Sequence, residues 1–160
     1  MKLITKAAIT LGLSIAVVAT AAFSASHVSK PQADSVKARQ GQMQLIGYHT
    51  GILGAMAKGE AEYDAAKATS AAKNLNAAAS FDRASLWLEG TEQGVADDNR
   101  AKAEIWTDAA GFDAKFMALQ DASAAMIDAA GTDLDSLKVA MGDIGKACGA
   151  CHDDYRGPKN

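Results

Sequence analysis

Proline is confined to two positions near the ends of the chain, Pro31 and Pro158, and none lies between them. A proline inside a helix removes a backbone hydrogen bond and clashes with the preceding turn, so the long stretch between the two prolines contains no such break. β-branched residues are sparse there and nowhere alternate with polar residues, which argues against strands. The sequence therefore predicts an all-α fold.

Apolar residues towards the C-terminus are spaced alternately three and four positions apart, which places them on one face of a helix. One such row is Ile105, Ala109, Phe112, Phe116, Leu119, Ser123 and Met126. The next is Leu134, Leu137, Met141, Ile144, Cys148, Cys151 and Tyr155. Rows of this kind form the core seams of helical bundles, and we expect an antiparallel four-helix bundle.

Glycines, prolines and capping residues set the expected helix boundaries. The predicted helices run over about 31–58, 63–79, 101–130 and 133–156, with Thr132 or Asp133 capping the last. Between the second and third, residues 80–100 contain Gly90, Gly94 and a polar cluster, and they read as a loop.

The first 26 residues have the parts of a secretory signal peptide. Lys2 and Lys6 precede an apolar run over 7–18, and small residues follow up to Ser26. The apolar run is shorter than the ~20 residues that span a bilayer, which argues against a membrane anchor. We expect an exported protein with a leader over 1–26, cleaved after Ala21, Ala25 or Ser26, and a single domain over 27–160.

Charge excludes some partners. Leader removal takes away two lysines and no acidic residue, so the net charge goes from −3 to −5. A mildly acidic chain without basic blocks is a poor binder of nucleic acids or anionic membranes. We expect no nucleic-acid partner and no membrane insertion of the mature chain.

The first predicted helix carries two apolar rows. Val36, Met43, Ile46 and Leu53 can face the bundle, whereas Leu45, Tyr48, Ile52 and Met56 form a second row displaced around the helix. A monomer needs one apolar face, so the second row indicates either a homodimer contact through this helix or a wide core face.

Both cysteines lie in the stretch "KACGACHDDYRG" near the C-terminus. A disulfide, a redox pair, a zinc site and a haem anchor are the possible uses of such a pair. A thioredoxin-type pair follows a strand, and this chain predicts none. Zinc needs about four ligands, yet the other histidines, His27 and His49, are far away in the sequence.

Helical spacing favours haem. Cys148, Cys151 and His152 stand at positions i, i+3 and i+4, so they project from one helix face, the continuation of the apolar row that starts at Leu134. C-x-x-C-H is the attachment signature of c-type haem, and covalent attachment requires the export that the leader predicts. We expect one covalent haem c on the last helix.

At this point the chain resembles the class II c-type cytochromes, above all cytochrome c′. The resemblance covers nearly the whole mature chain and is carried by "VKARQGQM", "AMAKGEAEYDAA", "AEIWTDAAGF" and "CGACHDDYR". It implies a periplasmic four-helix bundle with haem on the last helix. It also implies that Cys148 and Cys151 form the thioethers and that His152 is the axial iron ligand.

The resemblance assigns further residues to the haem site. It implies that Arg39 and Gln40 contact a haem propionate, although a solvated helix face is the plain alternative. It implies that Arg156 acts near the proximal histidine, although a cation at a helix C-terminus has its own favourable interaction with the helix dipole.

Met43 matches the position that faces the distal side of the iron. In cytochromes c′ the residue there blocks the site without binding, so the iron is five-coordinate and high-spin and accepts NO or CO. In low-spin relatives a methionine from this helix is the sixth ligand, which makes an electron carrier. A thioether suits either role, and the other segments resemble the five-coordinate branch more closely.

No constellation for substrate turnover is visible in the sequence, so we expect no enzyme. The rival from another class is a haem enzyme with peroxidase-like activity, which normally needs a polar distal acid–base group. Met43 is apolar, and His49 lies roughly 120° around the helix from it at ~100° per residue.

Overall fold

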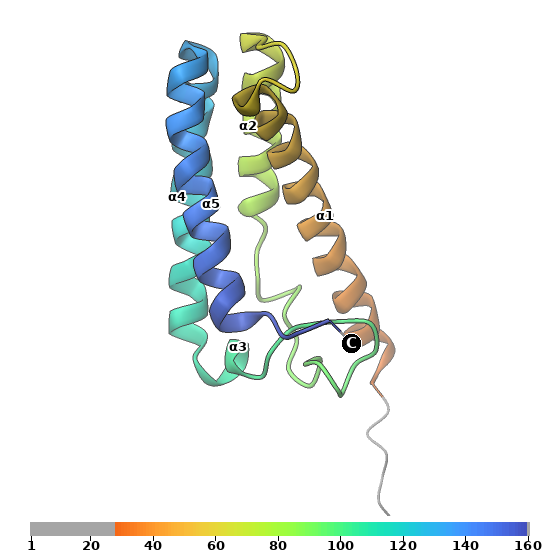
Figure 1. Cartoon of the computed structure of the whole chain (residues 1–160). Coiled ribbons are helices and arrows are strands. Elements are labelled where there is room, and N and C mark those ends of the chain that lie inside the picture. Colours follow the sequence, from red (N-terminus) through yellow and green to blue (C-terminus); the bar gives the residue numbers. More distant parts are fainter. Residues whose placement is uncertain (1–27, 160) are drawn as a thin grey trace, which may run out of the picture.

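Four long helices and one short helix make up the structure, a computed structural model that describes residues 28–159. In order they are α1 (Lys30–Lys58), α2 (Ala65–Ala79), α3 (Glu104–Thr107), α4 (Ala109–Thr132) and α5 (Leu134–Tyr155). The long helices run alternately up and down (Figure 1). The predicted antiparallel four-helix bundle is confirmed. The expected leader and His27 lie outside the described residues.

Side chains and glycine set the ends of the long helices, at Gly59 and Asp133 as the sequence predicts and at Asp64 without such a prediction. Gly59 ends α1 in the left-handed conformation, with φ of 76°, which glycine adopts without a steric penalty. Asp64 caps α2 by accepting a hydrogen bond from the backbone N–H of Lys67, at 2.9 Å. Asp133, one of the two predicted caps of α5, accepts one from the N–H of Ser136, at 2.7 Å. These bonds satisfy N–H groups that have no partner within the helix.

The prediction of one continuous helix over 101–130 is wrong at its start. Asp108 leaves helical geometry, with φ of −124° and ψ of 55°, and separates α3 from α4. Its carboxylate accepts hydrogen bonds from the N–H of Gly111 and from the hydroxyl of Tyr155, at 3.2 and 2.6 Å. Aspartate competes in this way with backbone pairing. Ala109, predicted in the core seam, is consequently exposed.

The same contact fixes Gly111 and Tyr155. A Cβ atom at Gly111 would collide with the Tyr155 hydroxyl and the Asp108 carboxylate, so only glycine fits. The hydrogen bond to Asp108, aided by burial, raises the pKa of Tyr155 to about 12. Tyr155 therefore stays a neutral donor at physiological pH and ties the end of α5 to the start of α4.

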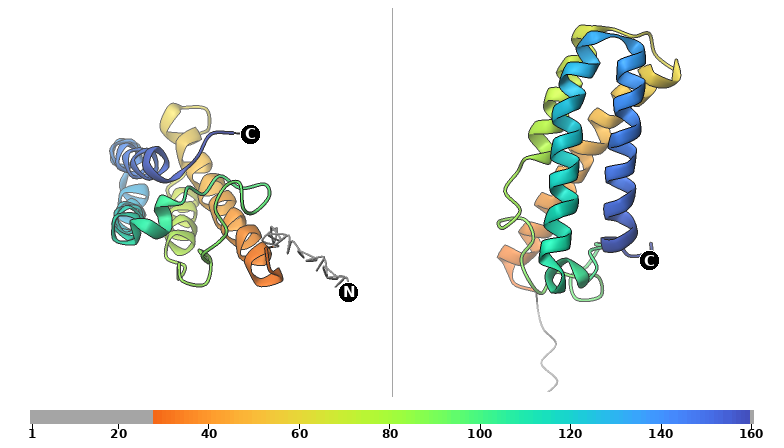
Figure 2. Two further views of the ribbon diagram at one scale, coloured as in Figure 1. Left: turned by 90° about the horizontal axis from the view of Figure 1, so that it is seen from below. Right: turned by 90° about the vertical axis from the view of Figure 1, so that its left-hand side faces the viewer.

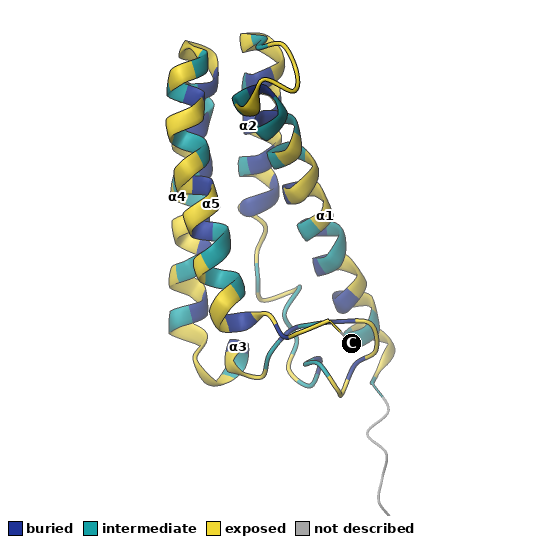
Figure 3. Cartoon of the chain, in the orientation of Figure 1, coloured by how far each residue is buried: buried dark blue, intermediate teal, exposed yellow. Residues whose placement is uncertain are grey.

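The core consists of two groups of buried side chains, and Figure 3 colours the ribbon dark blue at buried residues. The first, called here the aliphatic cluster, joins all four long helices and includes Ile46, Leu53, Leu75, Met126, Leu137 and Ile144. The second, the aromatic cluster, consists of Ala101, Ile105, Phe112, Phe116 and Tyr155, and Trp87 and Trp106 pack against it. The three- and four-residue spacing thus predicted which face of α4 and of α5 is buried.

The second apolar row of α1 divides between core and surface. Ile52 packs against the aliphatic cluster and Met56 is buried. Leu45 and Tyr48 are 47% and 66% exposed. The wide core face therefore accounts for half of this row, and two large apolar side chains remain on the surface.

Helix α2 is shorter than its neighbours, with 15 residues against 22 in α5. At 1.5 Å per residue it spans roughly 22 Å, whereas α5 spans roughly 33 Å. Beyond its end the chain continues as the predicted loop, which passes beside the last turns of α5 (Figures 1 and 2). Along the described residues, no helix combines the length and apolar character needed to cross a membrane.

The end of α5 is tied to this loop by backbone pairing. Ala101 and Arg156 form an antiparallel bridge. Beside it, the N–H of Gly157 donates to the carbonyl of Arg100 and the N–H of Lys102 donates to the carbonyl of Tyr155, at 2.7 and 3.1 Å. The loop therefore holds the C-terminal turn of α5 in place.

Candidate haem-binding site

Cys148, Cys151 and His152 lie on the last two turns of α5, where the two clusters meet. Both thiols are unpaired and partly buried. Cys148 packs against the aliphatic cluster and Cys151 against the aromatic cluster. The two cysteines therefore stand on the inner part of the helix, as the spacing predicts, and His152 beside them is partly buried.

The protonation states of these groups suit haem attachment. Burial raises the pKa of both thiols, that of Cys151 to about 11, so both are S–H groups at neutral pH. Burial and the charges of Arg156 and Arg100 lower the pKa of His152. A neutral imidazole is the form that binds a metal.

His152 is oriented by its neighbour one turn on. Nη1 of Arg156 lies 3.3 Å from Nδ1 of the imidazole. Nε2 lies on the other side of the ring from this contact. Arg156 is exposed and stands one turn after the histidine, and its action on the haem site stays a prediction.

Met43 reaches the same region from α1. Its side chain is partly buried and packs against both clusters, which places it at their junction. The cysteines of α5 contact these same two clusters. A residue from the first helix and the motif from the last helix thus face one region of the core.

Arg39, one turn before Met43, is 3% exposed. Its Nη1 donates to Thr91 Oγ1 at 2.7 Å, and its Nη2 donates to the Thr91 carbonyl and to Asn99 Oδ1 at 2.6 and 3.1 Å. The guanidinium also stacks on Trp87, with Cζ 4.8 Å from the ring centroid. The charge is therefore held against the loop, next to the aromatic cluster.

Gln40, predicted with Arg39 as a propionate contact, points elsewhere in the loop. Its amide donates to the backbone carbonyl of Asp98. The two neighbouring residues thus bind different parts of one loop, and their contact with a propionate stays a prediction.

Sequence reasoning missed the loop residues that hold Arg39. Thr91 is fully buried and Asn99 is 7% exposed, which is unusual for polar side chains in a loop. Trp87 and Trp106 were also not singled out, although both tryptophans of the chain lie against the aromatic cluster. Two tryptophans in and just after an otherwise polar loop are the sequence signal that could have indicated a buried loop.

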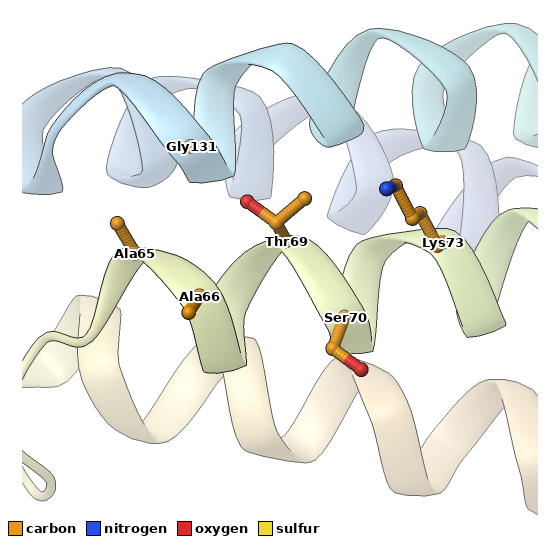
Figure 4. Close-up of a pocket in the computed structure, with 6 residues that line it drawn as sticks. All are labelled: Ala65, Ala66, Thr69, Ser70, Lys73 and Gly131. Carbon is orange, nitrogen blue, oxygen red and sulfur yellow. The ribbon is translucent and has the colours of Figure 1, made fainter.

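A separate depression lies between α2 and α4, at the other end of the bundle from the motif (Figures 1 and 4). Its lining is Ala65, Ala66, Thr69, Ser70, Lys73 and Gly131. It is an open surface feature between small side chains and has no part in the site on α5.

The residues present fit a covalent haem. Two free thiols and a neutral imidazole stand on one helix turn, they face apolar clusters that can cover a porphyrin, and a buried cation lies nearby. Fold and site together define a c-type cytochrome built as a four-helix bundle, with the attachment motif at the end of the last helix.

Comparison with known proteins identifies the family. Residues 34–156 match the family described as cytochrome C′. Cytochrome c-554 of Cereibacter sphaeroides is 45% identical over 121 residues, which are 76% of this chain and 79% of that protein. The chain belongs to the cytochrome c′ family, whose members carry a single covalently attached haem c.

Solved structures agree with this assignment. Cytochrome c′ of Rhodobacter sphaeroides is 41% identical, with a TM-score of 0.77 over 80% of this chain and 98% of that one. The nitric oxide complex of a variant cytochrome c prime from Alcaligenes xylosoxidans is 39% identical, with a TM-score of 0.70 over 82% and 100% of the two chains. The expected family, fold and cofactor are thus confirmed.

Proposed function

We propose that the chain is a periplasmic cytochrome with a five-coordinate, high-spin haem that exchanges one electron and binds NO or CO. The position of Met43 carries this proposal, because an apolar side chain between the two clusters would crowd the face opposite His152. The nitric oxide complex of the Alcaligenes relative supports gas binding. The leader expected over 1–26 supports the location, which recovery of the haem protein from the periplasmic fraction tests.

Each residue of the site has a distinct task. Cys148 and Cys151 would hold the haem by thioether bonds, and His152 would bind the iron through Nε2. Arg39 would supply a buried positive charge for a propionate, and Arg156 would restrict access beside His152. The haem supplies one-electron redox chemistry and an iron site for diatomic gases.

We propose no enzymatic turnover. Buried Gln42, next to Met43 on α1, donates to the carbonyl of Ala78 on α2, at 2.9 Å. The ring of His49 packs edge-on against the exposed Tyr48, with centroids 5.1 Å apart. Neither is a distal acid–base group of the kind that peroxidase activity needs.

The alternative is a six-coordinate, low-spin cytochrome in which Met43 is the sixth ligand. Replacement of Met43 by Leu distinguishes the two, because leucine fills similar volume and has no sulfur. On our proposal, the wild-type ferric spectrum is high-spin, the ferrous form binds CO at once, and Met43→Leu leaves both results unchanged. A low-spin wild type that becomes high-spin in Met43→Leu would establish the alternative.

We further propose a homodimer through α1. Leu45 and Tyr48 are the exposed apolar pair on this helix, and a Cβ atom added at Gly47 or Gly51 would meet nothing within 4 Å. The backbone there is open to close approach by a second helix. Sedimentation of the mature protein should give the mass of two chains, and Tyr48→Glu should reduce it to one.

A further inference from the structure

Two buried groups, one in the loop and one on α1 against it, are incompletely satisfied: the N–H of Trp87 and the charge of Arg39. The indole N–H of Trp87 is buried and, among the described residues, has no hydrogen-bond acceptor. The guanidinium of Arg39 is buried, and no carboxylate of the described chain forms an ion pair with it. Buried donors and charges are nearly always paired in native proteins, so each of these groups requires an explanation.

The two groups are neighbours. Cζ of Arg39 lies 4.8 Å from the centroid of the Trp87 ring, so the cation stacks on the indole. Trp87 packs against the aromatic cluster, with its ring 4.9 Å from that of Phe112, and Cys151 packs against the same cluster. The indole N–H and the guanidinium therefore both lie beside the proposed haem site.

The known contacts of Arg39 leave its charge uncompensated. Its three hydrogen bonds go to a hydroxyl, a carbonyl and an amide oxygen, all of which are neutral. Burial lowers the pKa of Arg39 to about 10, an effect that the charge of Glu92 only partly offsets. The arginine is still a cation at neutral pH, and no carboxylate of the described residues is bonded to it.

One chemical group can both neutralise Arg39 and accept a hydrogen bond from Trp87. A carboxylate supplies a negative charge for the guanidinium and several lone pairs for an indole N–H. The haem of this family carries two such groups, its propionates, whereas none of the side-chain carboxylates in the described chain is bonded to Arg39.

We propose that Trp87 anchors the haem, its indole N–H donating a hydrogen bond to the propionate that Arg39 neutralises. The inference rests on the proposed haem site and adds to it a residue that the sequence did not indicate. The guanidinium lies nearer to the ring of Trp87 than to that of Trp106, 4.8 against 5.9 Å from the two centroids, so the indole N–H of Trp87 and the cation can meet one carboxylate. Gln40, with its amide bonded to Asp98, is not needed for the contact.

The two tryptophans of the chain permit a direct test. The N–H of Trp106 already donates to the backbone carbonyl of Trp87, at 3.0 Å. In the holoprotein variant Trp106→Phe, Trp87 is the only indole, so ultraviolet resonance Raman spectroscopy reports its N–H alone. The spectrum should show a hydrogen-bonded indole. An indole band at the position of a free N–H would overturn the proposal.

The reduction potential provides a second readout, which a purely structural role of Trp87 would not move in this direction. Trp87→Phe removes a donor from an anionic group near the iron, so the ferric state gains stability and the potential falls. Tyr63→Phe is the control, because it removes a hydroxyl that donates to the carbonyl of Ala130 at the other end of the bundle, and it should leave the potential close to that of the wild type. Equal potentials in all three proteins would contradict the proposal. If Trp87→Phe fails to fold, the Raman spectrum of Trp106→Phe decides.

Failure of the proposed function gives a different result. A wild-type protein without a Soret band and without the added mass of haem would refute the haem site itself. A haem-loaded protein with a free Trp87 N–H would refute only the role of Trp87.

Discussion

Replacing Cys148 and Cys151 together by serine is expected to give a protein without covalently attached haem. Each thiol lies on the inner part of α5, against one of the two clusters, and each is in its S–H form at neutral pH. A thioether forms when such a sulfur bonds to a haem vinyl carbon, and a serine hydroxyl does not replace it. The mass of the purified chain should match the polypeptide alone, and its Soret band should be lost.

The control for this experiment is Ala150→Ser, which adds a hydroxyl to the same turn of α5 at an exposed position. It should keep the full haem mass and spectrum. Each single cysteine variant should retain haem through one thioether at most. Retention of covalent haem by the double variant would contradict the assignment of both residues.

Replacing Leu53 by alanine is expected to destabilise the protein by about 2–5 kcal/mol, the usual cost of a leucine lost from a well-packed core. Leu53 is fully buried in the aliphatic cluster, where α1 meets the other long helices. Because domains of this size are stable by only about 5–15 kcal/mol, the loss is a large share of the total. Denaturant unfolding of the haem-loaded protein, followed by circular dichroism, measures it.

Leu45→Ala makes the same chemical change on the same helix, at a side chain that is 47% exposed. Its cost should be below about 1 kcal/mol in dilute protein, where the proposed dimer contact is absent. Equal losses for Leu53→Ala and Leu45→Ala would mean that the buried face of α1 is assigned incorrectly.

Much of the bundle could be predicted because helical periodicity encodes which face is buried. The row from Leu134 to Tyr155 is the clearest case: each of its members is buried or partly buried in α5. Phe112, Phe116 and Met126 are likewise buried in α4. In both helices a 3.6-residue repeat and a single core face specify the same side chains, so local pattern and tertiary packing agree.

The break at Asp108 could not be predicted from such a pattern. The surrounding residues favour a helix, and an aspartate is tolerated on a helix surface. What ends α3 is the hydrogen bond to Tyr155, 47 positions further along the chain, together with the cap on Gly111. A contact over that separation leaves no periodic signal in the local sequence.

In the haem site, too, some residues could be predicted from the local sequence and others depend on distant contacts. The motif on α5 was evident from spacing, and the resemblance pointed to Met43 and Arg39 on α1. Thr91 and Asn99, which hold Arg39, lie 52 and 60 positions beyond it in a stretch with no repeat. Their role depends on how the loop folds over α1, which only the three-dimensional structure shows.

The loop contacts both sides of the haem site. Through Thr91 and Asn99 it holds Arg39 on α1, and through the bridge between Ala101 and Arg156 it holds the end of α5. Local unfolding of this loop would therefore release the charge on one side and the histidine-bearing turn on the other in a single event. The stability of this one loop thus links the two faces of the proposed haem site.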